Sequence, residues 1–222
     1  MDARGTALFS DDKACGPDDQ FSQSLDMLDN GCLPDLAADA EDAVLRVAQR
    51  YAYVFPSDAT LAMLSGLGPL VEMGAGTGYW AQRLRSIGVD IAAFDQAPVD
   101  GERTNRYHPR ARPWTHVGQG DQTVLPGYAD RSLFLCWPPL FSSLGDCLTY
   151  YRGDTVACIG DGGHRTARLD HLNEAFTKVA TAPVRALDPC PGARPQLTIW
   201  TRTPRPRRSE RARPATARRL SA

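Results

Sequence analysis

Three glycines spaced two apart mark the first segment of the chain whose residue types can organise chemistry. They are Gly74, Gly76 and Gly78, in the run L-V-E-M-G-A-G-T-G. Glycine lets the backbone turn tightly and come close to a ligand. Glu72 lies inside the apolar run just before this turn, where a carboxylate can meet the ammonium group of an amino acid but would repel a pyrophosphate. The turn therefore favours a ligand with an amino-acid group over a dinucleotide.

A second carboxylate, Asp95, follows the next apolar run, V-D-I-A-A-F. It stands 95 − 78 = 17 positions after the last glycine, where a carboxylate can accept hydrogen bonds from both hydroxyls of a ribose. The glycine spacing also differs from G-x-G-x-x-G, the pattern that seats a pyrophosphate at the start of a helix. Together these features indicate a nucleoside that carries an amino acid.

The same segments resemble two motifs of the class I S-adenosylmethionine-dependent methyltransferases. The run E-M-G-A-G-T-G is similar to the family's first motif and F-D to its second, and the likeness covers roughly residues 55–202. It implies S-adenosylmethionine as cofactor, with Glu72 and the glycines at its methionine part and Asp95 at its ribose. By the same likeness Asp121, in H-V-G-Q-G-D, lies where the family often places the acid that accepts the adenine amino group. The residues expected to bind the cofactor are Glu72, Gly74, Ala75, Gly76, Gly78, Tyr79, Asp95, Gln96 and Asp121.

These assignments have alternatives. The glycine turn can belong to an unrelated nucleotide-binding fold, Asp95 can be a turn former, and Asp121 can cap a loop. Tyr79 and Trp80 follow the turn directly, and either ring can cover the cofactor. Core packing is the favoured role for Trp80, because its spacing puts it on the buried face of a helix.

The run L-F-L-C-W-P-P is the second candidate for chemistry, at the reaction centre. Pro138 and Pro139 fix the backbone and remove two N–H donors, which leaves the carbonyls of Cys136 and Trp137 free to accept hydrogen bonds from a substrate amine. Trp137 can stack on a flat substrate. The run is similar to the Asp/Asn/Ser-Pro-Pro-aromatic motif of methyltransferases that act on amino groups, with Trp137 in place of the polar residue and Leu140 in place of the aromatic one. The alternative is a rigid strand terminator that only shapes the pocket.

A general base is needed if the methyl acceptor is a hydroxyl or a carbon, because transfer from a sulfonium is an in-line displacement that otherwise needs only proximity and alignment. His164, in G-D-G-G-H after a predicted strand, is the first choice, although a loop histidine can also be solvated or capping. The other candidates are His108, His116, Asp146 and Tyr150. No metal-ligand spacing occurs in the sequence, so no metal site is predicted.

Alternating strands and helices must position these residues. Residues 70–73 form a predicted strand, 79–87 a helix with Trp80, Leu84 and Ile87 on its buried face, and 89–94 a second, parallel strand. The other predicted strands are 115–117, 132–137, 155–160, 184–187 and 197–201, and a helix with Leu169, Leu172, Phe176 and Val179 on one face precedes the last two. The last two strands are joined by a segment too short for a helical crossover, so they are expected to form an antiparallel hairpin. The predicted fold class is α/β: a Rossmann-like, seven-stranded, mostly parallel sheet with an antiparallel last strand and helices on both faces.

Two helices are expected before the sheet. Apolar residues at helical spacing predict a helix over 36–52, and Ser57 or Asp58 caps a short helix that ends at Gly66 to Gly68. The run Y-A-Y-V-F at 51–55 either folds over the cofactor or packs against the sheet. Residues 34–68 are therefore predicted to be a helical lid on a methyltransferase domain of residues 34–202.

The two ends of the chain differ in charge. Residues 1–33 are acidic and 203–222 are rich in Arg and Pro, and both have too few apolar residues to fold alone. The basic tail is either an arm that binds nucleic acid or an acidic partner, or simply a solvated tail. Because Lys13 and Lys178 are the only lysines, the sequence has a general bias towards Arg, which favours the solvated tail.

Six scattered cysteines without a C-x-x-C pair indicate free thiols, and no apolar run is long enough to span a bilayer. The start of the sequence lacks the pattern of a signal peptide, so a cytoplasmic protein is predicted.

The sequence predicts an enzyme that methylates an amine or hydroxyl of a small-molecule substrate. A nucleic-acid methyltransferase that uses the Pro-Pro motif and the basic tail is a second hypothesis, and a catalytically silent cofactor-binding protein is a third. The fold alone does not choose between them.

Overall fold

The computed structural model describes residues 37–139, 146–161, 172–186 and 194–204. Its contacts divide the chain into two units, the first ending at Arg46 and the second beginning at Val47. Helix α2 (Ala37–Arg50) confirms the helix predicted over 36–52. Of the sequence predictions, His164, Leu140, the acidic segment 1–33 and the tail from residue 205 onwards lie outside the described residues.

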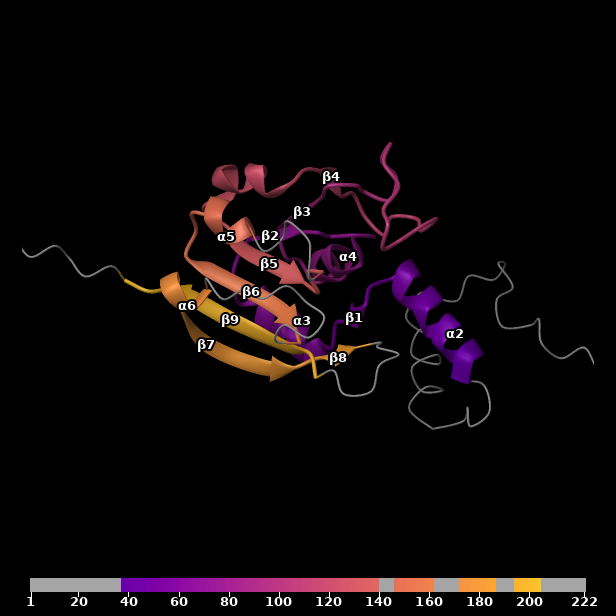
Figure 1. Ribbon diagram of the computed structural model, residues 1–222. Coiled ribbons are helices and arrows are strands. Elements are labelled where there is room, and N and C mark those ends of the chain that lie inside the picture. Colours follow the sequence, from indigo (N-terminus) through magenta and orange to yellow (C-terminus); the bar gives the residue numbers. More distant parts are fainter. Residues whose placement is uncertain (1–36, 140–145, 162–171, 187–193, 205–222) are drawn as a thin grey trace, which may run out of the picture. The chain divides into compact units, whose positions relative to one another are not determined.

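A seven-stranded mixed sheet forms the second unit, and Figure 1 shows β5, β6, β9 and β7 running side by side. Its order is β4-β3-β2-β5-β6-β9-β7. Neighbours from β4 to β6 are parallel, whereas β9 is antiparallel to both β6 and β7. This confirms the predicted fold class. The strands are β2 (Leu70–Met73), β3 (Ile91–Asp95), β4 (Gly118–Gln119), β5 (Ser132–Cys136), β6 (Thr155–Gly160), β7 (Phe176–Pro183) and β9 (Gln196–Arg202).

The first strand, turn and helix of the sheet follow the sequence closely. Strand β2 is buried along its length, and α4 (Tyr79–Ser86) begins after Gly78, whose φ of 77° is one that favours glycine. The chain then returns through Gly88 to β3, which pairs parallel with β2. Ile87 differs from the prediction: it caps the end of α4 and is 51 % exposed, because the helix ends before it.

Helices cover both faces of the sheet, because successive strand residues point to opposite sides. On one side Leu70 and Phe134 pack with residues of α3 (Asp58–Ser65) and α4. On the other side Val71 and Leu133 pack with the 3₁₀ helix η1 (Gln122–Tyr128) and with α5 (Cys147–Tyr150). Ser57 caps α3 and Gly66 ends it, as the sequence predicted.

The hairpin at the end of the sheet is built from a different strand than predicted. Phe176 and Val179, expected on a helix, lie in β7. Among the described residues of the predicted helix, only the short α6 (Leu172–Ala175) is helical, and Leu169 lies outside the described residues. Threonine and valine fit an extended strand, and pairing with β9 overrides the helical spacing. Within the predicted strand 184–187, Arg185–Ala186 form β8, which pairs with β1 (Val54–Phe55) in a separate two-stranded sheet.

The strand predicted over 115–117 was also wrong in position. The short edge strand is β4, just after it. The Thr115 hydroxyl and the His116 carbonyl accept hydrogen bonds from Arg85 of α4. Residues 115 and 116 are therefore bonded to the helix, and the pairing with the sheet begins only at Gly118.

Among the described residues, none of the helices combines the length and apolar character needed to cross a membrane. The three described cysteines, Cys136, Cys147 and Cys158, are free.

Candidate functional site

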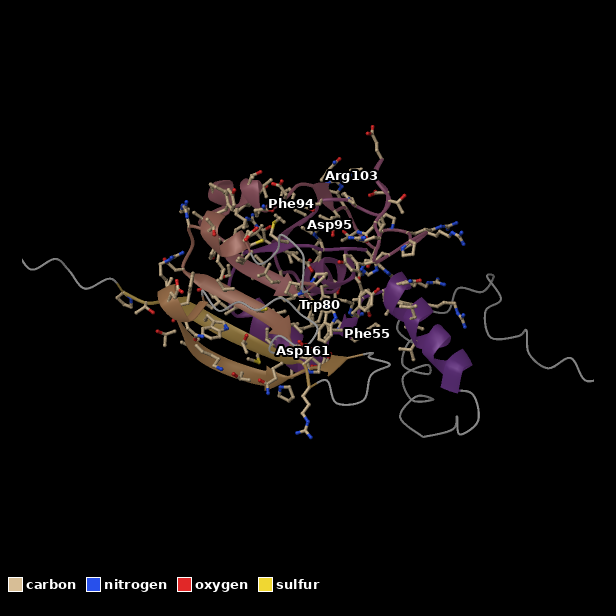
Figure 2. The ribbon with its side chains drawn as sticks, in the orientation of Figure 1. Phe55, Trp80, Phe94, Asp95, Arg103 and Asp161 are labelled. Carbon is tan, nitrogen blue, oxygen red and sulfur yellow. The ribbon has the colours of Figure 1, made fainter. Side chains whose placement is uncertain are left out.

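A cavity of about 420 Å³ opens at the carboxyl ends of the parallel strands. Residues that end or directly follow β2, β3, β4 and β5 line it, which is where ligands bind in open α/β sheets. Asp95 and Trp80, both labelled in Figure 2, line it from β3 and α4. The volume suits a small molecule of the size of a nucleoside with a side chain.

Most of the predicted site residues come together in this cavity. Gly78 and Pro138 do not line it, and the other candidate bases among the described residues, His116, Asp146 and Tyr150, lie elsewhere. Trp80, for which core packing was favoured, is buried and also lines the cavity. The predicted residues that line it are Glu72, Gly74, Ala75, Gly76, Tyr79, Asp95, Gln96, Asp121, Trp137 and Pro139.

The glycine turn is fastened to the end of β3. The amides of Gly74 and Ala75 donate to the carbonyl of Phe94 at 2.8 and 3.0 Å. The amide of Gly76 donates to Oδ2 of Asp95 at 2.9 Å. Because the carboxylate is anchored to the turn, the two segments that the sequence singled out form one rigid arrangement.

Both oxygens of Asp95 have defined partners. Oδ2 accepts from Gly76, and Oδ1 accepts from the amide of Ala97 at 2.9 Å. A carboxylate can accept about four hydrogen bonds. Asp95 can therefore hold its own loop and still accept hydrogen bonds from ligand hydroxyls.

Glu72 is the most unusual group in the cavity. It is 1 % exposed, and its Oε2 has no hydrogen-bond partner among the described residues. Burial raises its pKa to about 8, Arg85 opposes that rise and Asp95 adds to it. Buried polar atoms are normally hydrogen-bonded. An ammonium group beside Oε2 would supply the missing partner and stabilise the charged carboxylate, so the site fits a ligand with a cationic amine.

Cys136 lies near Glu72. Burial raises the pKa of its thiol well above the ordinary value, and Glu72 raises it further. The thiol therefore stays protonated and is not a nucleophile.

A loop between β3 and β4 brings in residues that the sequence did not assign to the cofactor. The buried side chain of Asn105 donates to the carbonyl of Ala97 at 2.8 Å, and its Oδ1 accepts from the amides of Tyr107 and His108. These bonds hold Tyr107 and His108 against the cavity. The sequence offered only a weak signal, since Asn is a common turn former and His108 was one of several candidate bases.

His108 is 9 % exposed, and the carbonyl of Gln49 lies 2.8 Å from its Nδ1. A carbonyl only accepts, so Nδ1 carries the proton. Burial lowers the pKa of His108, although the bond to Gln49 and the charge of Asp95 both oppose this. The imidazole is therefore neutral at pH 7, with Nε2 unprotonated.

The segment 51–55 runs from the cavity into the core. Tyr51 and Tyr53 line the cavity, whereas Val54 and Phe55 (Figure 2) are buried and pair with β8. The indole of Trp80 donates to the carbonyl of Val54 at 2.9 Å, which fixes the segment beside the glycine turn. Folding over a bound ligand remains a hypothesis for its first three residues.

An aromatic cluster supports that segment. The ring of Tyr51 stacks on Trp114 with centroids 4.9 Å apart, and Tyr79 meets both rings edge-on at 5.3 Å. The Trp114 indole donates to the carbonyl of Arg50. Tyr79 thus lines the cavity as part of a packed group of rings.

Trp137 has an uncommon backbone conformation at the end of β5. Its φ is 53°, in the left-handed region that favours glycine, and its amide donates to the carbonyl of Ile159 at 2.9 Å. Such strain costs about 1–2 kcal/mol and often accompanies functional sites. Trp137 and Pro139 line the cavity, whereas Pro138 is buried.

Asp121 caps a helix as well as lining the cavity. Its Oδ1 accepts from the amide and the hydroxyl of Thr123 at the start of η1. These bonds lower its pKa, so it is a carboxylate at pH 7. The loop-cap alternative is therefore confirmed, and both cap bonds use one oxygen.

The structure matches many S-adenosylmethionine-dependent methyltransferases at low sequence identity. Magnesium protoporphyrin IX methyltransferase from Synechocystis PCC 6803 is 9 % identical, with 76 % of this chain and 85 % of that chain covered and a TM-score of 0.45. The 1,6-didemethyltoxoflavin-N1-methyltransferase of Burkholderia thailandensis is 18 % identical over 88 % of this chain and 94 % of that one, with a TM-score of 0.42. The tRNA (uracil-54, C5)-methyltransferase of Pyrococcus abyssi is 12 % identical over 64 % and 37 %, with a TM-score of 0.40.

No family model matches the sequence, and no curated protein matches it. A shared fold does not determine the substrate, which depends on the residues of the cavity.

Proposed function

We propose that this protein binds S-adenosylmethionine in the cavity and transfers its methyl group to an amine or hydroxyl of a small-molecule substrate. One observation carries the proposal: a buried carboxyl oxygen of Glu72, which has no hydrogen-bond partner within the described part of the chain, shares a cavity with the anchored carboxylate of Asp95. The first suits an ammonium group and the second suits hydroxyls. A nucleoside that carries an amino acid has both.

Three carboxylates would hold the cofactor in this proposal. Glu72 would receive the ammonium group, Asp95 the ribose hydroxyls, and Asp121 the adenine amino group. When bound, S-adenosylmethionine supplies a methyl group on a positively charged sulfur.

The residues after β5 would bind the substrate. Trp137 offers an aromatic face, and the Pro138–Pro139 pair lacks amide donors, so nearby carbonyls can accept hydrogen bonds from an amine. An amine substrate needs no strong base if it arrives uncharged. A hydroxyl substrate would need one, for which His164 is the first candidate.

Methylation of a nucleic acid is the second candidate function, and the arginine-rich segment 203–222 favours it. It predicts that nucleic-acid affinity depends on that segment and falls steeply with salt. A protein that binds the cofactor without transferring its methyl group is the third.

Calorimetric titration with S-adenosylmethionine and S-adenosylhomocysteine tests the proposal. Asp95→Ala should weaken binding about 10- to 100-fold, since hydrogen bonding to a charged acceptor is lost. Asp100→Ala is the matched control, because Asp100 is exposed and lies outside the cavity. A folded wild-type protein that binds neither ligand would refute the cofactor assignment.

Turnover then separates the three functions. Wild-type protein and a variant ending at residue 202 are incubated with labelled cofactor and with small amines, small alcohols, RNA or DNA. Transfer to a small molecule by both proteins supports the proposal. Transfer to nucleic acid that requires the tail supports the second function, and cofactor binding without transfer supports the third.

A further inference from the structure

Two hydrogen-bond acceptors converge on Gly76 from different segments. Its amide donates to Oδ2 of Asp95 at 2.9 Å. On its other side, a Cβ added to Gly76 would lie 2.6 Å from Nε2 of His108 and 2.8 Å from Cδ2 of that ring. The imidazole edge therefore rests on the turn at the residue that anchors the Asp95 carboxylate.

The tautomer of His108 turns its free nitrogen into an acceptor. Nδ1–H donates to the carbonyl of Gln49, so Nε2 has a lone pair and no proton. Nε2 has no hydrogen-bond partner among the described residues, and His108 lines the cavity. The hydrogen bond at Nδ1 fixes both the tautomer and the orientation of the ring, and so determines where Nε2 points.

Three further contacts hold His108 in place. Asn105 binds the backbone amide of His108, the ring of Tyr53 meets the imidazole edge-on at 5.6 Å, and Gly76 lies against its edge. The Tyr53 hydroxyl donates to the carbonyl of Tyr107, which ties the neighbouring segment to the same loop. The acceptor is thus preorganised before any ligand arrives, which reduces the cost of binding.

An anchored carboxylate beside a neutral imidazole acceptor suits a ligand with two adjacent hydroxyl donors. Each Asp95 oxygen already accepts one backbone hydrogen bond. A second acceptor beside Asp95 can therefore take the hydrogen bond from one of the two ligand hydroxyls. We propose that His108 is a further ligand-binding residue, whose Nε2 accepts a hydrogen bond from one ribose hydroxyl of the bound cofactor while Asp95 accepts one from the other. This proposal rests on the proposed function, since it takes S-adenosylmethionine as the ligand.

Two substitutions separate this role from a purely structural one. His108→Asn keeps an amide donor near the position of Nδ1, for Gln49, but has no atom at the position of Nε2. His108→Gln places its amide near Nε2 and loses the bond to Gln49. His116→Asn is the matched control, because His116 is exposed and does not line the cavity.

The experiment is calorimetric titration of the full chain and its variants with S-adenosylhomocysteine and with its 2′-deoxy and 3′-deoxy analogues. His108→Asn should weaken binding of S-adenosylhomocysteine about five- to tenfold, the effect of one lost hydrogen bond. His108→Gln should stay within about threefold of the wild type on the same scale. One deoxy analogue should bind His108→Asn and wild-type protein equally well, which identifies the hydroxyl that His108 contacts.

Three results would overturn the role of His108. They are unchanged binding in His108→Asn, a loss in His108→Gln but not in His108→Asn, and an equal loss for all three ligands. The second would mean that only the bond to Gln49 matters. If wild-type protein binds S-adenosylhomocysteine and Asp95→Ala does not, the proposed function stands whatever His108 does. If wild-type protein binds none of the ligands, the proposed function fails and this inference fails with it.

Discussion

Glu72 should release a proton when the cofactor binds near neutral pH. Its pKa of about 8 means that the carboxyl is mostly protonated at pH 7 before a ligand binds, with about ten protonated molecules for each charged one. An ammonium group beside Oε2 stabilises the charged form, so about 0.9 proton should leave Glu72. The amino group of the cofactor has an ordinary pKa near 8 and takes up about 0.1–0.2 proton when held charged. The expected result is a net release of somewhat less than one proton per site at pH 7.

The sign of this effect should change with pH. At pH 6 both groups start fully protonated, and the net release approaches about one proton. Near pH 8 the release from Glu72 and the uptake by the amino group nearly cancel, and at pH 9 uptake dominates. Affinity follows the net release, so it should rise almost tenfold per pH unit from about pH 6 to 7, be greatest near pH 8 and fall above it.

Titration of S-adenosylhomocysteine in two buffers of different ionisation enthalpy measures the proton count directly. Glu72→Gln should release no proton and should lose the rise in affinity below pH 8, whereas Glu102→Gln, at an exposed position, should behave as the wild type. A wild-type protein that binds the ligand with no buffer dependence at pH 7 would refute the pairing of Glu72 with the ammonium group.

Two further predictions concern stability. Because the pKa of Glu72 is raised from 4.5 to about 8, the folded protein holds a proton that the unfolded chain loses, so stability should decrease by up to about 1.4 kcal/mol per pH unit between roughly pH 5 and 8. Urea unfolding across that range should show this slope in the wild type, and an equal slope in Glu72→Gln would contradict it. Gly76→Ala should cost about 1–2 kcal/mol for its positive φ and about 1–3 kcal/mol for the collision with His108. His108→Ala should relieve the second part, and strict additivity in a double-mutant cycle would exclude the contact.

The strand, glycine turn and helix from Leu70 to Ser86 were predictable because their signals are local. A buried apolar run, glycines at positive φ and helical spacing each depend on a few neighbouring residues. The hairpin at the end of the sheet was not predictable in the same way. Residues 176–183 have apolar residues at a spacing that also suits a helix, and only the pairing with β9 decides for a strand.

The same contrast applies within the cavity. Glu72 and Asp95 were found because each ends or lies in a strand beside a recognisable turn. His108 follows no periodic pattern, and its position depends on Gln49 and Asn105 and on the absence of a side chain at Gly76. No local rule connects residues 49, 76 and 108, so His108 was predictable only as one of several candidate bases.

Burial of Glu72 gives the cavity a means of selecting its ligand. An uncharged carboxyl costs less free energy to bury than a carboxylate. Before a ligand binds, Glu72 therefore keeps its proton and carries little charge at neutral pH. A ligand with an ammonium group would form a buried ion pair with Glu72. A ligand with phosphates has no cation to pair with Glu72 and would be repelled by the carboxylates of Asp95 and Asp121. The selection therefore depends on burial as much as on the presence of an acid. An exposed glutamate would be charged at neutral pH and would attract any cation, but a buried one gives up its proton only to a cation that fits against Oε2.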